Sequence, residues 1–323
     1  MAFIIDPVQF DKQSIDPETK QFNEALIAEL TPVPDMWSMP ASVVRQNRMK
    51  GKGPFPIEPP EKTAAQFVVK GKGGDIPVRW LKPKSGSAAG TYLHIHGGGW
   101  VLGSCDAQDT RLQEIADNCQ LDCISVEYRL APEHPYPAGP DDCETVALWL
   151  LEGKHELNTD FLAIGGESAG AHLSVITLLR LRDRLSTCPF HAANLTAGVY
   201  DLGQTASARN WGTKKLILTT RDMQKFASRF VQGAHDLRDP NISPLYANLA
   251  GLPPALFSIG TEDLLLDDTL QMATRWHVKN GNAVLDVTPG GCHVFQGFRH
   301  LKIAEKSNRI IDNFLNQVRN KRS

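Results

Sequence analysis

The sequence contains no long apolar run and few cysteines. No stretch reaches the roughly 18 consecutive apolar residues that a membrane-spanning helix needs. The first residues, MAFIIDPVQFDK, have neither the basic segment nor the long apolar segment of a signal peptide. Six cysteines among 323 residues are too sparse for a disulfide scaffold, and buried free thiols are the better interpretation. We therefore expect a cytoplasmic protein that does not span a membrane.

An excess of charge of one sign is also missing. Lys and Arg together number 34 and Asp and Glu 36, so the formal net charge is −2. Nothing in this balance indicates binding to a nucleic acid or to an anionic membrane. Cys119 and Cys123 are separated by three residues, but no second Cys or His pair has the spacing of a zinc site. We expect no bound metal.

Repeats and low-complexity segments are absent as well. No internal period of 20 to 50 residues is visible, which excludes solenoids and propellers. Hydrophobic residues make up 41% and charged residues 22%, near the average for soluble globular proteins, which excludes a disordered, collagen-like or coiled-coil chain. A chain of 323 residues can form one large domain or two smaller ones around a sizeable core.

The sequence does contain a regular alternation of strand-like and helix-like segments from residue 91 onward. The predicted strands are 91–96, 123–128, 161–165, 195–200, 255–259 and 284–288, and the predicted helices are 109–119, 141–151, 169–185, 267–279 and 301–318. Strands connected by helices of this length form βαβ units, so we predict an α/β fold with a mainly parallel central sheet flanked by helices. Ligands bind to such folds at the carboxyl ends of the strands.

Two regions interrupt this alternation. The N-terminal region has predicted helices at 17–30 and 41–49, then the Gly/Pro-rich segment GKGPFPIEPPEK and a predicted hairpin of strands 66–70 and 76–81. Between about residues 203 and 239, predicted helices follow one another without strands. We predict that residues 1–60 and 203–240 form a helical cap, and that residues 61–202 and 241–323 form the α/β core.

The segment Gly166-Glu167-Ser168-Ala169-Gly170 lies between a predicted strand and a predicted helix. A G-x-S-x-G turn in this position exposes the serine hydroxyl at the start of the helix. It also directs the N–H of the following residue, Ala169, toward a developing oxyanion. A Gly/Ser turn that only caps a helix is the alternative. The strand before the turn and the helix after it favour a nucleophile at Ser168.

The segment His96-Gly97-Gly98-Gly99-Trp100 directly follows the predicted strand TYLHI. Successive glycines let the backbone approach a ligand closely, and their N–H groups can converge on a carbonyl oxygen, as in the HGGG-type loops of lipases and esterases. A flexible loop or a phosphate-binding turn is the alternative, but neither G-x-x-x-x-G-K-[ST] nor G-x-G-x-x-G fits this segment. We expect His96 to bond to its own loop rather than to act as a base.

A nucleophilic serine needs a base and an acid that orients the base, and in this type of sheet the chain order is serine, acid, histidine. His293 follows the last predicted strand within PGGCHVF, and Asp263 follows the predicted strand ALFSI. Glu262 is the alternative acid, whereas Asp267 and Asp268 fit the first turn of the next helix better. His172 fits a core or capping position on the elbow helix, and three later histidines lack a glycine-rich loop: His191, His235 and His277.

Together these segments resemble the hormone-sensitive lipase family of α/β-hydrolases, the HGGG-type bacterial carboxylesterases of family IV. The resemblance runs from about residue 62 to the end and rests on HGGGW at 96–100, YRLAPEHPYPA at 128–138, GESAG at 166–170, ISPLYANLAGLPPALFSIGTED at 242–263 and GCHVF at 291–295. It implies the α/β-hydrolase fold with a helical cap. It also implies a nucleophile, an acid and a base at Ser168, Asp263 and His293, and oxyanion-hole N–H groups from Gly98, Gly99 and Ala169.

Two positions depart from the family pattern. Glu167 stands where many members carry Asp, and Leu264 replaces the usual Pro after the acid. We expect the first change to be tolerated, and the second to alter the shape of the loop rather than catalysis.

The resemblance implies a serine carboxylesterase that hydrolyses short- to medium-chain esters through an acyl-enzyme, with no metal or organic cofactor. An amidase or arylformamidase with the same triad is an alternative. A non-catalytic small-molecule receptor is another, but such a protein should have lost a triad residue. Candidate walls of the substrate pocket are Trp100, Trp211, Phe226 and Phe230, and a core position is an equally good interpretation of each. A homodimer could form through the edge strand near 284–288 or through the last helix.

Overall fold

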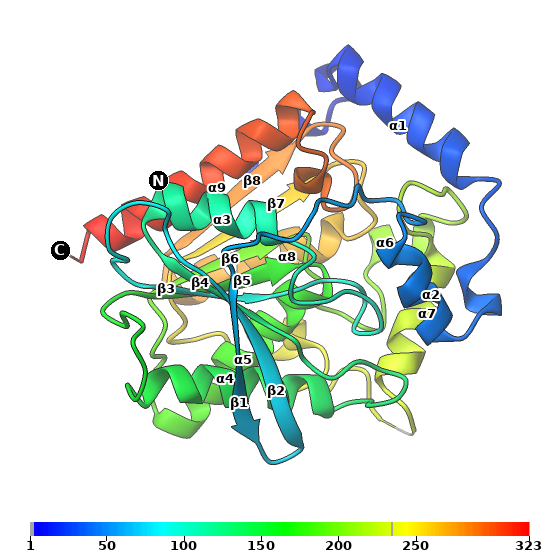
Figure 1. Ribbon diagram of the computed structural model, residues 1–323. Helices are drawn as coiled ribbons and strands as arrows, with labels where there is room; N and C mark the ends of the chain where they lie inside the picture. Colours follow the sequence, from blue (N-terminus) through cyan, green and yellow to red (C-terminus); the bar gives the residue numbers. More distant parts are fainter. Residues whose placement is uncertain (1–2, 234, 323) are drawn as a thin grey trace.

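The computed structural model describes residues 3–233 and 235–322, and one eight-stranded sheet forms its centre (Figure 1). The strands are β1 (Ala65–Gly71), β2 (Gly74–Leu81), β3 (Thr91–Ile95), β4 (Asp122–Val126), β5 (Leu162–Glu167), β6 (Ala192–Thr196), β7 (Ala255–Gly260) and β8 (Ala283–Thr288). Their order across the sheet is β1-β2-β4-β3-β5-β6-β7-β8. The β1–β2 and β2–β4 pairs are antiparallel and the others are parallel. The predicted mainly parallel α/β sheet is confirmed.

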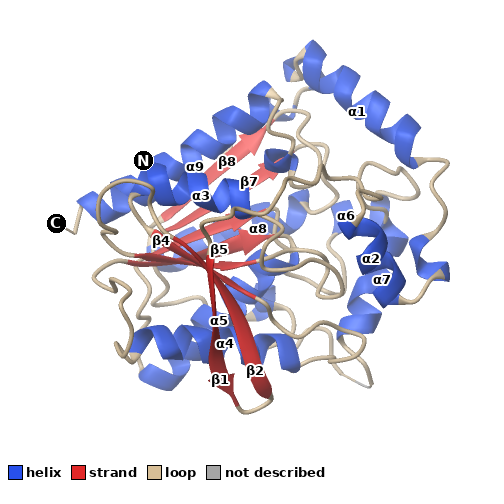
Figure 2. Cartoon of the chain, in the orientation of Figure 1, coloured by secondary structure: helices blue, strands red, loops and turns tan. Residues whose placement is uncertain are grey.

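Helices cover both faces of this sheet (Figure 2). On one face, α3 (Asp109–Cys119) and α9 (Lys302–Asn320) pack together and share a buried cluster with Cys123 and Leu256. On the other face lie α4 (Ala138–Leu151), α5 (Ala169–Leu185) and α8 (Leu266–Asn280). Because both faces are covered, every residue of β3 and β4 is buried, which explains why these strands lack polar alternation.

The remaining helices gather beyond one end of the sheet, at the right of Figure 1. They are α1 (Pro17–Leu30), α2 (Ala41–Met49), α6 (Ala206–Asn210) and α7 (Thr220–Phe230). The indole N–H of Trp37 donates to Asp222 at 2.6 Å, and Arg221 pairs with Asp35 at 2.7 Å. The N-terminal region therefore packs against the insertion between β6 and β7.

One predicted strand is displaced. It was expected at 195–200, but β6 is Ala192–Thr196, and the chain leaves the sheet at Ala197, whose φ is +46°. The residues that follow are buried as they would be in a strand, but they form a loop. In that loop the N–H groups of Tyr200 and Asp201 donate to the Asp268 carboxylate.

Helix α4 begins at Ala138 rather than at residue 141. The prediction started the helix after Pro140, but a proline fits the first helical turn, where its missing N–H has no intrahelical partner. Within the described ranges, no helix combines the length and the apolar character needed to cross a membrane.

Candidate active site

Ser168 lies in a strained turn between the end of β5 and the start of α5. Its φ of +56° and ψ of −119° are unusual for a residue with a side chain. Gly166 and Gly170 permit the turn, because a Cβ at these positions would lie 2.0 and 1.9 Å from the carbonyl oxygen of Ile95. The two glycines let the elbow press against β3, which places the serine at the carboxyl edge of the sheet.

His293 joins Ser168 to Asp263 in a line of buried hydrogen bonds. Its Nε2 is 3.0 Å from the Ser168 Oγ, and its Nδ1 is 2.9 Å from the Asp263 Oδ2. Asp263 is also fixed by the N–H of Leu265, which donates to its Oδ1 at 2.9 Å. With an ionised Asp263 accepting from Nδ1–H, Nε2 is left free to accept the serine proton.

Close packing of two loops brings the acid to the base. A Cβ on Gly260, at the end of β7, would lie 1.9 Å from the carbonyl oxygen of Gly291, in the loop after β8. The alternative acid, Glu262, turns its carboxylate to Lys214 instead. Asp267 accepts from the N–H of Ser207, and Asp268 from the N–H of Tyr200. Of the four acids considered, Asp263 is the one bonded to His293.

The glycine loop supplies backbone donors beside this line. Gly98 and Gly99 have φ values of +113° and +62°, and added Cβ atoms would meet the Leu102 carbonyl at 2.2 Å and the Phe226 ring at 2.3 Å. Within residues 3–233 and 235–322, the N–H groups of Gly98, Gly99 and Ala169 bond to no acceptor. Three unpaired donors next to a serine hydroxyl can stabilise an oxyanion. His96 bonds through Nδ1 to the Gly97 carbonyl, as expected.

Glu167 ties the elbow to the glycine loop. Its Oε1 accepts the N–H of Gly97 at 2.8 Å, and its Oε2 lies 3.1 Å from the Nε2 of His94. The Nδ1 of His94 is 2.9 Å from the hydroxyl of Ser125. Burial opposes ionisation of Glu167, but His94 and the Gly97 N–H outweigh it, so the pKa of this carboxyl is below its ordinary value.

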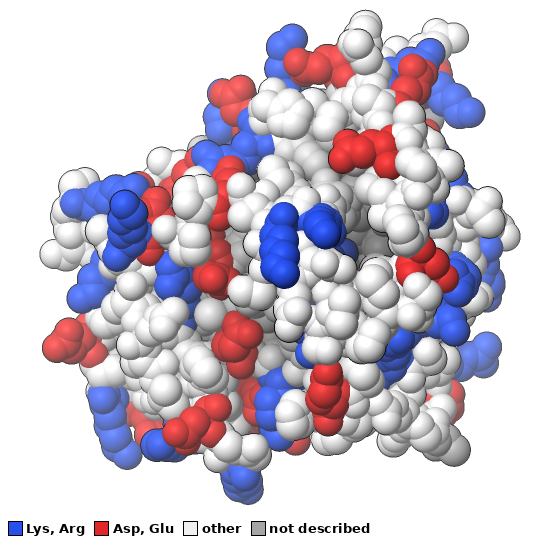
Figure 3. Space-filling view, turned by 45° about the vertical axis from the view of Figure 1, so that its right-hand side comes forward, with Lys and Arg blue, Asp and Glu red and all other residues white. Residues whose placement is uncertain are grey.

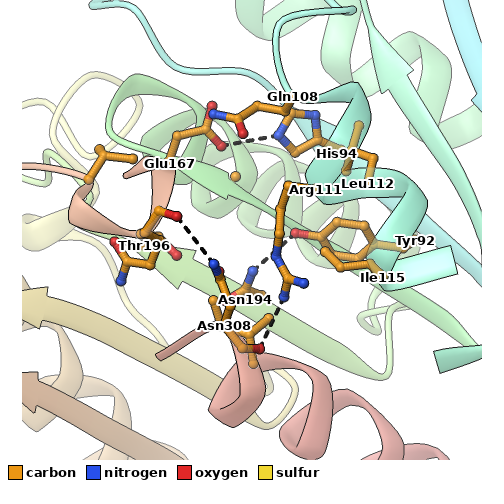
Figure 4. A pocket seen from close by; sticks show the side chains of 15 residues that line it. Tyr92, His94, Gln108, Arg111, Leu112, Ile115, Glu167, Asn194, Thr196 and Asn308 are labelled. Atoms are coloured by element: carbon orange, nitrogen blue, oxygen red, sulfur yellow. Dashed lines mark hydrogen bonds and ion pairs between the residues drawn. The ribbon is translucent and has the colours of Figure 1, made fainter. Parts of the chain in front are cut away.

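A small polar cavity lies behind Glu167 (Figure 4). Its volume is about 50 Å³, which is room for a few water molecules. Asn194 and Gln296 each present a buried side-chain oxygen that has no partner among the described residues. Tyr92 accepts from Asn194 at 3.2 Å, and Arg111 donates to the Asn308 carbonyl at 3.1 Å. Polar groups therefore surround Glu167, and such an environment stabilises an ionised carboxylate.

A much larger cavity of about 840 Å³ opens in front of the serine. Ser168, His293 and the glycine loop form its floor. Its apolar lining residues include Met49, Pro54, Phe55, Pro56, Ile57, Trp100, Leu130, Val199, Ile217, Leu218, Met223 and Phe226. This size is in the range of sites that bind small organic ligands.

The predicted pocket walls are only partly in place. Trp100 and Phe226 line the large cavity. Phe230 lies behind the wall, stacked on Trp100 with 4.6 Å between ring centroids. Trp211 is not among the described residues that line this cavity: its indole N–H donates to the Lys214 carbonyl and its ring faces the Lys214 ammonium, 4.7 Å from the centroid. An aromatic residue in the insertion is therefore not by itself a pocket residue.

Four cavity residues were not predicted from the sequence: Arg45 and Arg48 line the large cavity, His94 the small one, and Gln108 both. Two of them had a detectable signal. Arg45 and Arg48 are one turn apart on α2, so they share a face of a helix that the sequence already predicted.

A parallel sheet with a serine elbow, a following acid and a final histidine defines the α/β-hydrolase class. A family model described as alpha/beta hydrolase fold matches residues 92–297. The carboxylic ester hydrolase LipN of Mycobacterium tuberculosis is 33% identical over 211 residues, which are 62% of this chain and 55% of LipN. The chain therefore spans little more than half the length of that relative.

Two further proteins match over more of their length. The esterase LipI of M. tuberculosis is 30% identical over 279 residues, which cover 83% of each chain. A hyperthermophilic esterase from Pyrobaculum calidifontis has a TM-score of 0.82 and 28% identity over 94% of this chain and 98% of its own. The chain belongs to the α/β-hydrolase family, in its hormone-sensitive lipase group. The resemblance inferred from the sequence is confirmed.

Proposed function

We propose that the protein is a serine carboxylesterase that acts on short- to medium-chain esters through an acyl-enzyme. The observation that carries this proposal is the line of hydrogen bonds from Asp263 through His293 to Ser168, beside three backbone N–H groups that have no acceptor among the described residues. LipN is named as a carboxylic ester hydrolase, and LipI and the P. calidifontis protein as esterases, which supports an ester as substrate.

The geometry suits the following steps. The Ser168 Oγ attacks the ester carbonyl carbon while the His293 Nε2 takes the serine proton. The N–H groups of Gly98, Gly99 and Ala169 stabilise the resulting oxyanion, and one such donor is worth about 3–4 kcal/mol. The C–O bond to the alcohol then breaks, and the alcohol leaves with the proton from His293.

The second half of the reaction releases the acid. Water gives a proton to His293 and attacks the acyl carbon, which frees the carboxylic acid and returns the proton to the Ser168 oxygen. Asp263 remains ionised throughout, keeps the proton of the imidazole on Nδ1 and stabilises the imidazolium. None of these steps requires a metal or an organic cofactor.

Residues 1–60 and 203–240 would act as the cap that shapes the acyl site. Arg48, Ile217, Met223 and Phe226 come from these stretches and line the same cavity as Ser168. A helical cap over this cavity supports the preference for short and medium acyl chains that the resemblance implies.

We also propose a cytoplasmic location, a small-molecule substrate and a homodimer. The sparse cysteines, all six of them unpaired, support a cytoplasmic location. The near-neutral charge balance supports a small-molecule substrate rather than a nucleic acid. β8 is at one edge of the sheet, and this edge supports a homodimer formed by strand pairing there or through α9.

A fluorophosphonate ester tests the proposed nucleophile directly. The intact protein should gain one phosphonyl group, which peptide mass spectrometry should locate on Ser168. Ser168→Ala should gain none while its circular dichroism spectrum stays that of the folded protein. Labelling at another residue, or no labelling of the folded wild-type protein, would contradict the proposal.

A further inference from the structure

Arg48 lies in the wall of the cavity that contains Ser168 and His293. Within the described part of the chain, its guanidinium forms no hydrogen bond and no ion pair, and its side chain is partly buried. Arg45, one turn earlier on α2, differs: it pairs with Glu133 at 2.7 Å and donates to the carbonyl oxygens of Val101 and Ala131. The charge of Arg45 is therefore neutralised, and that of Arg48 is not.

The acidic residues of the cavity wall are already engaged elsewhere. Glu58 pairs with Arg299 at 3.2 Å, and Glu127 accepts the N–H of Cys105 at 2.6 Å. Asp106 accepts the hydroxyl of Ser104, and Glu167 is bonded as described above. Among the described residues, no carboxylate forms an ion pair with Arg48, and burial alone shifts its pKa.

Burial lowers the pKa of Arg48 to about 10, which leaves the guanidinium charged at neutral pH. A charge that loses its hydration without gaining a partner is unfavourable, and an anion bound beside it removes that cost. A negative group that enters the cavity beside Arg48 would therefore stabilise this guanidinium.

Arg48 is also held in position. Arg45, on α2, donates a hydrogen bond to the carbonyl oxygen of Val101, which directly follows the glycine loop. Arg48 lies on the same face of α2. The Arg48 stem runs along Gly53, where an added Cβ would lie 3.4 Å from the Arg48 Cγ. In the space-filling view that brings this side forward, basic side chains lie near the middle of the face (Figure 3).

We propose that Arg48 selects esters that carry a carboxylate, binding that carboxylate while the ester carbonyl lies at Ser168. This inference rests on the proposed esterase function and adds the class of substrate. A single unpaired guanidinium matches a monoanion, and its planar fork can donate two parallel hydrogen bonds to a carboxylate. A phosphate dianion would call for a second unpaired cation, and Arg45 is already committed to Glu133.

A pair of esters that differ only in charge tests the proposal. Mono(4-nitrophenyl) glutarate carries a free carboxylate, and methyl 4-nitrophenyl glutarate is its neutral counterpart. The measured quantity is the ratio of the two kcat/KM values, hemiester to diester. Arg48→Met keeps the apolar stem and should lower this ratio about 10- to 100-fold, mainly through KM of the hemiester. Arg48→Lys should restore part of it.

Lys52→Met is the matched control, because it removes one exposed charge near α2 without altering the cavity wall. It should leave the ratio unchanged. If Arg48→Met also leaves the ratio unchanged, or if Lys52→Met lowers it equally, the inference fails while the esterase function stands.

A different result separates the two proposals. If the folded wild-type protein hydrolyses neither ester, the esterase function fails, and the inference is then judged by equilibrium binding of the hemiester. The Ser168→Ala variant should bind the hemiester at least about 10-fold more tightly than the double variant Ser168→Ala/Arg48→Met does. Equal affinities would overturn the role of Arg48.

Discussion

Glu167 shows how one side chain can set the geometry of a neighbouring loop. It precedes the serine on the elbow and holds the N–H of Gly97, next to the proposed oxyanion donors. Glu167→Ala should lower kcat about 10- to 100-fold with little change in KM, since displaced donors weaken transition-state binding rather than substrate binding. Steady-state kinetics on a neutral nitrophenyl ester measure both parameters.

Glu167→Gln is the conservative variant for this prediction. Its amide oxygen can still accept from Gly97, and its NH₂ group can donate to His94 if the imidazole changes tautomer. Most of kcat should return. If Glu167→Gln is as slow as Glu167→Ala, the charge of the glutamate matters rather than its hydrogen bond, and the positioning role is wrong.

His172 makes the stability of the protein depend on pH. Its ring is fully buried, with Nδ1 accepting from the Trp100 indole at 3.1 Å and Nε2 donating to the Ile242 carbonyl at 2.8 Å. Burial lowers its pKa to about 4. Between pH 6.5 and 4 the unfolded chain therefore binds a proton that the folded protein does not, so the free energy of unfolding falls as the pH falls, by up to about 3 kcal/mol.

His172→Gln should remove this part of the acid sensitivity. A glutamine can accept from Trp100 and donate to Ile242, but it does not titrate. Urea unfolding of both proteins at several pH values between 8 and 4 measures the difference, which should grow toward acid pH in favour of the variant. If the free energy of unfolding changes with pH by the same amount in both proteins, His172 is not the titrating group.

At the scale of elements, α7 connects the N-terminal region to the insertion. Asp222 closes a capping box with Thr219 at the start of α7 and accepts the indole N–H of Trp37. Asp222→Ala removes both, so it should lower the free energy of unfolding by about 2 kcal/mol and expose the N-terminal region to proteolysis. Denaturant unfolding and limited trypsin digestion measure the two effects.

Arg221→Ala provides the neighbouring control. The pair that Arg221 forms with Asp35 is largely exposed, so its loss should cost less than about 0.5 kcal/mol. Equal destabilisation by the two substitutions would mean that the capping box of α7 and the hydrogen bond from the Trp37 indole contribute no more stability than an exposed ion pair.

Most helices were predictable because local periodicity and capping agree with the packing. The predicted ranges 17–30, 109–119 and 169–185 are the observed α1, α3 and α5. The strand predicted at 195–200 failed because buried apolar residues look alike in a central strand and in a buried loop. What ends β6 is the positive φ at Ala197 and the bonding of Tyr200 to Asp268, which is remote in sequence.

For the whole molecule, the order of strands and loops along the chain predicted which loops meet at the site. It did not predict which side chains surround those loops. Ser168, Asp263 and His293 follow three parallel strands, and parallel strands bring their carboxyl ends to one edge. Arg48 and Trp211 depend on how the N-terminal region and the insertion fold over that edge. No local pattern distinguishes a side chain that faces the cavity from one that faces solvent there.

The proposed nucleophile and acyl site are tested most directly by the initial rate of hydrolysis of 4-nitrophenyl esters from acetate to palmitate, with Ser168→Ala measured beside the wild-type protein. We expect fast turnover of short and medium chains, a steep fall toward palmitate, and a loss of at least about 10³-fold in the variant. A folded wild-type protein that hydrolyses no chain length, or a variant that retains more than about a tenth of the activity, would contradict this expectation.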